Sequence, residues 1–110
     1  MYEYKEKYTL DFSKIEHWEE FHQIIKAELD FPNSYGGNWS AFWDCLTEIL
    51  DVEEPLNIEI LGAEILEQKF PGTLKKMIEI LKRLKHWHSE KYYDFVKVEI
   101  VCGDARYEIQ

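Results

Sequence analysis

The chain begins its regular pattern with apolar residues that alternate with polar ones, at Tyr8, Leu10 and Phe12. This period of two predicts a β-strand that ends at Ser13. Helical intervals follow, with apolar residues at Trp18, Phe21, Ile25 and Leu29. Ser13 and Glu16 have the spacing of a capping box, so we expect the helix to begin near Ser13 and to stop before Pro32.

A loop is predicted over residues 31–38, where proline, asparagine, serine and glycine are concentrated. Asn38 is a good N-cap for a second helix that begins near Trp39 and runs to about Leu50. At 100° per residue, the apolar stripe of this helix consists of Trp39, Phe42, Leu46, Ile49 and Leu50. The polar positions opposite that stripe are Ser40, Asp44, Thr47 and Glu48.

The second half of the chain alternates strands with helices. Strands are predicted at 56–61 and 95–101, and the sequence between them predicts a short helix at 63–70 and a longer one that contains Leu74, Ile78, Leu81 and Leu84. Pro71 and Gly72 separate the two helices. Strands joined by helical crossovers favour a parallel sheet. The predicted class is therefore α/β, with three parallel strands packed by about four helices.

Length and composition favour one domain over residues 1–110, because 110 residues that are 45% hydrophobic can bury one core. We see no run of about 18 apolar residues and no apolar signal-peptide core at the N-terminus, so a cytoplasmic protein without membrane contact is expected. Cys45 and Cys102 lie far apart within apolar stretches. We expect reduced, buried thiols rather than a disulfide.

The net charge of -9 comes from one segment. Residues 27–68 contain ten acids and no lysine or arginine, whereas the rest of the chain carries 12 acids and 13 bases. A local negative field repels nucleic acid and attracts a basic protein partner. On charge alone, an acidic surface that only maintains solubility explains the pattern equally well.

The residue types needed for catalysis or metal binding are scattered. No two of the four histidines, His17, His22, His86 and His88, have the i, i+4 spacing of a helical metal site. Cys45 has no histidine nearby in sequence to activate it. Gly36 and Gly37 precede a helix start, as in phosphate-binding loops, but no lysine or arginine accompanies them. We therefore expect no enzyme, cofactor or metal, and a small anion- or nucleotide-binding module is the weakest alternative.

Several stretches resemble the barstar family, namely Phe21-His22-Gln23, Lys26-Ala27-Glu28-Leu29, Pro32, Tyr35-Gly36, Asn38 and Ala41-Phe42-Trp43-Asp44-Cys45-Leu46-Thr47. The resemblance is strongest from Phe21 to Leu50. Members of this family are intracellular inhibitors that plug the active site of a secreted ribonuclease with this loop and the following helix. The resemblance implies a barstar-like fold, and a chain that is a monomer when free and binds a basic protein, a secreted ribonuclease.

The resemblance places the partner-binding residues between 33 and 48, and they are Ser34, Tyr35, Gly36, Gly37, Asn38, Trp39, Ser40, Trp43, Asp44, Thr47 and Glu48. Asp44 matches the family's central aspartate, whose carboxylate can replace an RNA phosphate in a cationic site.

The sequence also departs from the family pattern. Ser40 replaces a second interface aspartate, Ser34 replaces an aromatic residue, and Trp39 is larger than the aliphatic residue usual there. Glu48 lies one turn after Asp44 and can restore the missing negative charge. Members of the family also use an acidic residue on the later helix to contact the partner. The basic run at residues 82–85 suggests that this contact is absent or reversed here. An immunity or regulatory protein for a different partner is therefore the main alternative.

Overall fold

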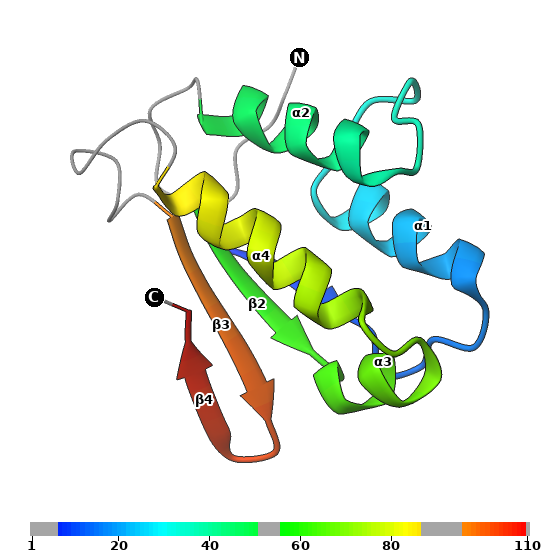
Figure 1. The fold of residues 1–110 in the computed structure, drawn as a ribbon, viewed down its shortest axis with the longest axis vertical. Helices are drawn as coiled ribbons and strands as arrows, with labels where there is room; N and C mark the ends of the chain where they lie inside the picture. Colours follow the sequence, from blue (N-terminus) through cyan, green and yellow to red (C-terminus); the bar gives the residue numbers. More distant parts are fainter. Residues whose placement is uncertain (1–6, 51–55, 87–95, 110) are drawn as a thin grey trace.

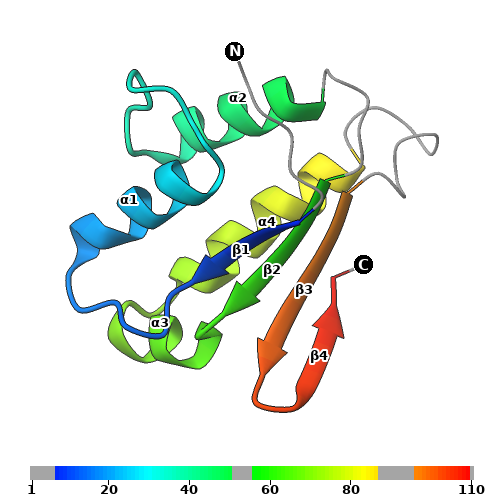
Figure 2. The ribbon, with the colours of Figure 1, turned by 180° about the vertical axis from the view of Figure 1, so that it is seen from behind.

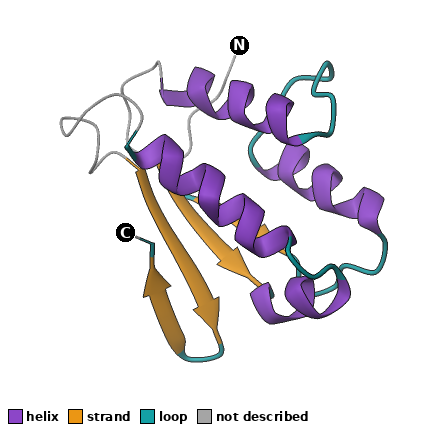
Figure 3. Ribbon diagram, viewed as in Figure 1, coloured by secondary structure: helices purple, strands orange, loops and turns teal. Residues whose placement is uncertain are grey.

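The computed structural model describes residues 7–50, 56–86 and 96–109. In chain order the elements are β1 (Tyr8–Asp11), α1 (Trp18–Glu28), α2 (Trp39–Leu50), β2 (Leu56–Leu61), α3 (Ala63–Lys69), α4 (Thr73–Lys85), β3 (Val96–Cys102) and β4 (Ala105–Glu108). The α/β class is confirmed, and all three predicted strands and four predicted helices are present (Figure 3). No helix in the described part of the chain is long and apolar enough to cross a membrane.

The four strands form one sheet in the order β1-β2-β3-β4. β1 pairs with β2 and β2 with β3 in parallel, so that Tyr8, Ile58 and Val98 lie side by side across the sheet. Figure 1 shows α4 in front of the strands, with α2 beside it, and Figure 2 shows α1 next to β1. Seen from behind in Figure 2, the strands lie in front of α4. The helices therefore pack on one face of the sheet.

The core lies between that face and the helices. Alternate residues of β2 are buried because a strand points successive side chains to opposite faces, and the buried residues include Leu56, Ile58 and Ile60. From the helices, the fully buried side chains include Phe21, Ile25, Phe42, Leu46, Met77 and Leu81. Burial of Phe42 and Leu46 orients α2, so that its polar positions face away from the core.

A fourth strand, β4, was not predicted. It pairs antiparallel with β3 through a two-residue turn at Gly103 and Asp104, with Cys102 opposite Ala105. Gly103 has φ 59°, a left-handed conformation suited to glycine. All four residues of β4 are exposed. The strand therefore lacks the apolar alternation on which the prediction of strands depended.

The predicted start of the first helix at Ser13 was also wrong. The backbone N–H of Ser13 donates to the Asp11 carboxylate at 2.9 Å, which makes a turn rather than a helix cap. The actual N-cap is His17, and the carboxylate of Glu20 accepts from the backbone N–H groups of His17 at 2.8 Å and Glu16 at 3.1 Å. These hydrogen bonds lower the pKa of Glu20.

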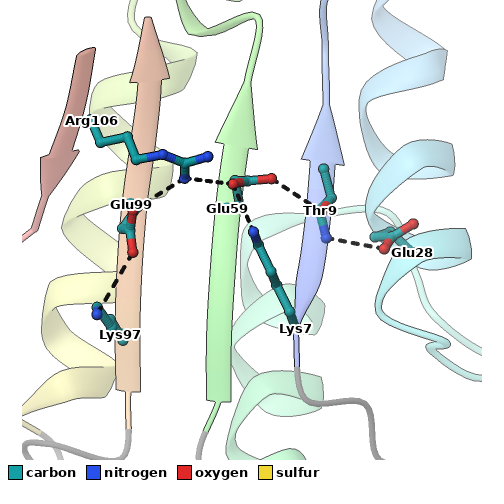
Figure 4. A network of polar contacts seen from close by, with 7 residues as sticks. All are labelled: Lys7, Thr9, Glu28, Glu59, Lys97, Glu99 and Arg106. Carbon is teal, nitrogen blue, oxygen red and sulfur yellow. Dashed lines mark hydrogen bonds and ion pairs between the residues drawn. The ribbon is translucent and has the colours of Figure 1, made fainter. Parts of the chain in front are cut away.

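Charged side chains occupy the face of the sheet away from the helices (Figure 4). Glu59 of β2 is only 8% exposed and forms ion pairs with Lys7 at 2.9 Å and Arg106 at 2.7 Å. The hydrogen bonds from Lys7 and Arg106 lower the pKa of Glu59. Arg106 also reaches Glu99 at 3.3 Å. This network ties β4 to the centre of the sheet.

The two cysteines are unpaired, as expected, but both are half-buried rather than fully buried. Burial raises the pKa of the Cys45 thiol, and the negative charges of Glu48 and Asp44 raise it further. Hydrogen bonding to Glu64 raises the pKa of the Cys102 thiol. Both thiols are therefore poor nucleophiles near neutral pH.

Candidate functional site

The segment that leads into the candidate site leaves α1 through a tight turn. Asp30 adopts φ 54°, and the backbone N–H of Phe31 then donates to the carbonyl of Lys26 at 3.0 Å. This is the Schellman arrangement, in which a left-handed residue ends a helix and frees the chain to turn. Phe31 is buried beneath the loop. The loop therefore starts from a fixed point on the core.

Tyr35 ties the middle of the loop to α1. Its backbone N–H donates to the carbonyl of Pro32 at 2.9 Å, and its hydroxyl shares a hydrogen bond of 2.7 Å with Nδ1 of His22. The Tyr35 ring packs on Phe31, with ring centroids 5.1 Å apart. Burial lowers the pKa of His22 and raises that of the Tyr35 phenol, so both are neutral near pH 7. A neutral pair with a short hydrogen bond holds the loop in place.

The tip of the loop is exposed and ends in a helix cap. Ser34, Gly36 and Gly37 are exposed, and Gly37 adopts φ 66°, where a side chain would be strained. The side-chain oxygen of Asn38 accepts from the backbone N–H of Ala41 at 2.8 Å. The predicted N-cap is thus confirmed, and the loop passes directly into α2.

Trp39 begins α2 within an aromatic cluster. Its ring lies 5.5 Å from Phe21, 5.8 Å from His22 and 6.0 Å from Phe42, measured between centroids. The side chain is half-buried. The large ring that departs from the family pattern therefore fixes the first turn of α2 against α1 and leaves part of its surface accessible.

Ser40, Asp44 and Glu48 form an exposed row along α2, because each follows the last by four residues. Thr47 is half-buried, and its hydroxyl donates to the backbone carbonyl of Asp44 at 2.8 Å. Neither Asp44 nor Glu48 forms an ion pair within the described residues. The two carboxylates are therefore available to a partner.

A groove separates this row from α4. Its lining comes from both helices and consists of Trp39, Ser40, Trp43, Asp44, Lys76, Ile80 and Arg83, around a cavity of about 260 Å³. The guanidinium carbon of Arg83 lies 4.4 Å from the centre of the Trp43 ring, a cation–π contact. Trp43 is half-buried, with part of its surface against the core.

The structure brings the eleven sequence-predicted residues together as one continuous loop and helix face. Sequence reasoning missed the α4 side of the groove, namely Lys76, Ile80 and Arg83. The basic run at residues 82–85 pointed to this helix, but Lys76 and Ile80 lie outside that run. Only the packing of α4 beside α2 identifies them.

The acidic segment does not form one patch. Of its ten acids, Asp44 and Glu48 lie on α2, whereas Glu59 is paired on the open face of the sheet and Glu28 accepts from the backbone N–H of Thr9 at 3.0 Å. Glu64 and Glu67 belong to α3. Asp51, Glu53 and Glu54 lie outside the described residues. Asp30, the tenth acid, is exposed in the turn after α1. Of these acids, Asp44 lines the groove and Glu48 lies one turn further along α2.

Within the described residues, no three histidine, cysteine, aspartate or glutamate side chains gather into a possible metal site. His86 is exposed at the end of α4, and His88 lies outside the described residues. The N–H groups at the start of α2 are partly used by Asn38, and no cation belongs to the loop. The loop therefore has few features of a phosphate site.

Comparison with other proteins identifies the family. Residues 6–99 match the family model described as "Barstar (barnase inhibitor)". A Bacillus subtilis (strain 168) protein named "Putative ribonuclease inhibitor YrdF" is 32% identical over 86 residues, which cover 78% of this chain and 92% of that protein. No solved structure matches the chain significantly. The matched residues include the loop, α2 and α4, whereas β4 follows them.

Proposed function

This chain belongs to the barstar family, and on that premise we propose that it is a protein inhibitor that blocks the active site of a ribonuclease. The description of the family names an inhibitor of barnase and no catalytic activity. Under this proposal the chain acts in the cytoplasm as one domain over residues 1–110, is a monomer when free, and binds a basic, secreted ribonuclease. It needs no cofactor and binds neither nucleic acid nor membranes.

The observation that carries the proposal is the position of Asp44. Its carboxylate is exposed at the middle of α2, on a helix held by the cap at Asn38 and by the buried side chains of Phe42 and Leu46. A ribonuclease must hold an RNA phosphate with cationic side chains. A carboxylate on a rigid helix can occupy the same place and form charge-assisted hydrogen bonds there.

The other binding residues support that contact. Ser34, Gly36 and Gly37 present a surface without bulky side chains, and their backbone can approach the partner closely. Trp39 and Trp43 offer the exposed parts of two large rings, which suit the centre of an interface. Glu48 supplies a second carboxylate one turn from Asp44. The Thr47 hydroxyl, which lies between them in sequence, donates to the backbone carbonyl of Asp44.

An inhibition titration tests the proposal, with barnase as the ribonuclease because the family description names it. RNA cleavage is measured at increasing concentrations of the chain and of substrate. We expect inhibition at a one-to-one ratio that is relieved by excess RNA, because the chain and the substrate compete for one site. Undiminished cleavage, or inhibition that excess RNA does not relieve, would contradict an active-site blocker of this nuclease.

A different protein partner is the second candidate, and the structure offers a specific reason to keep it. Ser40 contributes no charge beside Asp44, and the opposite wall of the groove carries Lys76 and Arg83. A partner whose site is cationic throughout would meet like charge on that wall.

A further inference from the structure

Charge changes sign between the two helices that flank the groove. α4 carries five bases, Lys75, Lys76, Lys82, Arg83 and Lys85, and a single acid, Glu79. The neighbouring α2 carries two acids, Asp44 and Glu48, and no base. Because α2 and α4 pack side by side (Figure 1), one surface presents both signs.

The stability of α4 explains only part of this pattern. Cations in the last turn of a helix interact favourably with its dipole. Lys85 is buried, and its ammonium group donates to the backbone carbonyl of Val96 at 2.6 Å. Lys76, in contrast, lies near the start of α4, where the dipole disfavours a positive charge. Its position on the wall of the groove therefore needs another reason.

The guanidinium of Arg83 is positioned by Trp43 in a way that leaves it able to bind a partner. Its guanidinium stacks over Trp43 at 4.4 Å, which leaves the N–H groups at the edge of the planar group free to donate. Within the described residues, no carboxylate lies within ion-pair distance of Arg83 or Lys76, although Asp44 lines the same groove. The two cations and the carboxylate thus remain available as separate contacts.

We propose that Lys76 and Arg83 determine specificity, by selecting a protein partner that presents a carboxylate next to the cationic centre bound by Asp44. This inference rests on the proposed function and names the chemistry of the partner. A cation next to that centre would face Lys76 and Arg83 at close range, and like charges brought together in an interface weaken binding. An acidic side chain there would accept from the Arg83 fork. Nuclease sites often need such a carboxylate as a general base.

A charge exchange across the interface tests the inference. Two nucleases serve as probes: barnase itself, and a barnase variant in which the basic side chain nearest Arg83 in the complex is replaced by glutamate. Dissociation constants are measured for the parent chain and for Lys76→Glu, Arg83→Glu and the double variant. We expect the parent to bind the glutamate-bearing nuclease at least about tenfold more tightly than barnase itself, and the double variant to reverse that order.

Two control variants separate groove charge from other effects. Lys75→Glu makes the same change in net charge at an exposed residue of α4 that does not line the groove, so the order of affinities should stay as in the parent. Arg83→Lys keeps the charge but weakens stacking on Trp43, and should also keep the order. Circular dichroism and urea unfolding check that each variant is folded.

The inference is overturned if the double variant keeps the parent's order of affinities, or if Lys75→Glu changes that order as much as Arg83→Glu does. A loss of the preference in Arg83→Lys would also overturn it, because packing rather than charge would then set specificity. The proposed function fails separately, if the parent binds neither nuclease or if Asp44→Ala binds both as the parent does.

Discussion

Replacing Asp44 with alanine separates the binding role of this residue from any role in folding. The side chain is exposed, and within the described residues its carboxylate forms no ion pair. The Asp44 backbone carbonyl accepts from the Thr47 hydroxyl at 2.8 Å, and this hydrogen bond is kept in the variant. Truncation therefore breaks no ion pair within the described residues, and alanine favours the helix.

The expected magnitudes follow from those contacts. An exposed polar residue on a helix changes the free energy of unfolding by about 0.5 kcal/mol or less. Truncating one partner of a buried, hydrogen-bonded charge pair in an interface costs about 2 to 5 kcal/mol of binding. At about 1.4 kcal/mol per tenfold, the dissociation constant should rise by roughly 30-fold to several thousandfold. Close charge pairs in the complex of barnase with barstar, a member of this family, have coupling energies of about 1.5 to 7 kcal/mol.

Two measurements check the prediction. Urea unfolding of the parent and of Asp44→Ala gives the change in stability, and titration calorimetry or inhibition of barnase gives the change in affinity. Glu48→Ala is the comparison on the same helix face, one turn further along. Its effect should be smaller, unless Glu48 replaces the charge missing at Ser40, in which case the losses in the double variant should be non-additive.

A control for net charge completes the design. Glu19→Gln removes one negative charge from an exposed position of α1, outside the loop and the groove. It should leave affinity almost unchanged. If Asp44→Ala inhibits like the parent, or loses no more affinity than Glu19→Gln, the replacement of an RNA phosphate by Asp44 is refuted.

Further predictions concern association, the indole of Trp43, and the hydrogen-bonded pair of His22 and Tyr35. Raising the ionic strength should slow association with the nuclease, because salt screens attraction between Asp44, Glu48 and a basic partner, and an on-rate that is flat from low to physiological salt in stopped-flow measurements would contradict this. Trp43→Phe should weaken inhibition clearly while lowering the thermal midpoint only slightly. A large drop in the midpoint with unchanged inhibition would assign the residue to the core. Burial lowers the pKa of His22 below its ordinary value of 6.5. As the pH falls, the unfolded chain therefore binds a proton at this histidine before the folded chain does, and the stability that His22 contributes above about pH 6.5 is lost. Urea unfolding at several pH values should show this decline in the parent chain and a smaller decline in His22→Gln. At neutral pH, Tyr35→Phe should lower the free energy of unfolding by about 1 kcal/mol, because it removes the hydrogen bond to His22.

The loop and α2 could be predicted from the sequence because their signals are local. Asn38 caps a helix through its own side chain, and Phe42 and Leu46 recur at the helical period that buries one stripe. The polar row that contains Asp44 then follows from geometry alone. The role of that row in binding came from the resemblance, since periodicity cannot distinguish a solvated face from an interface.

The start of the first helix and the fourth strand could not be predicted correctly from the sequence. Ser13 and Glu16 have the spacing of a capping box, yet Ser13 donates to Asp11 and the cap forms at His17. β4 carries no apolar alternation, because it is exposed and owes its place to backbone pairing with β3 and to ion pairs of Arg106. Neither outcome can be read from spacing alone.

The sequence by itself determined the order of strands and helices, the cap and buried stripe of α2, and the position of Asp44 on the opposite face, because each depends on residues within a few turns of one another. Tertiary structure alone decided that His22 holds Tyr35, that Glu59 is neutralised on the open face of the sheet, and that Lys76 and Arg83 form the second wall of the groove. These contacts join residues that are at least 13 positions apart in the sequence. Which of these distant residues meet depends on how the helices and strands pack as a whole rather than on any local period.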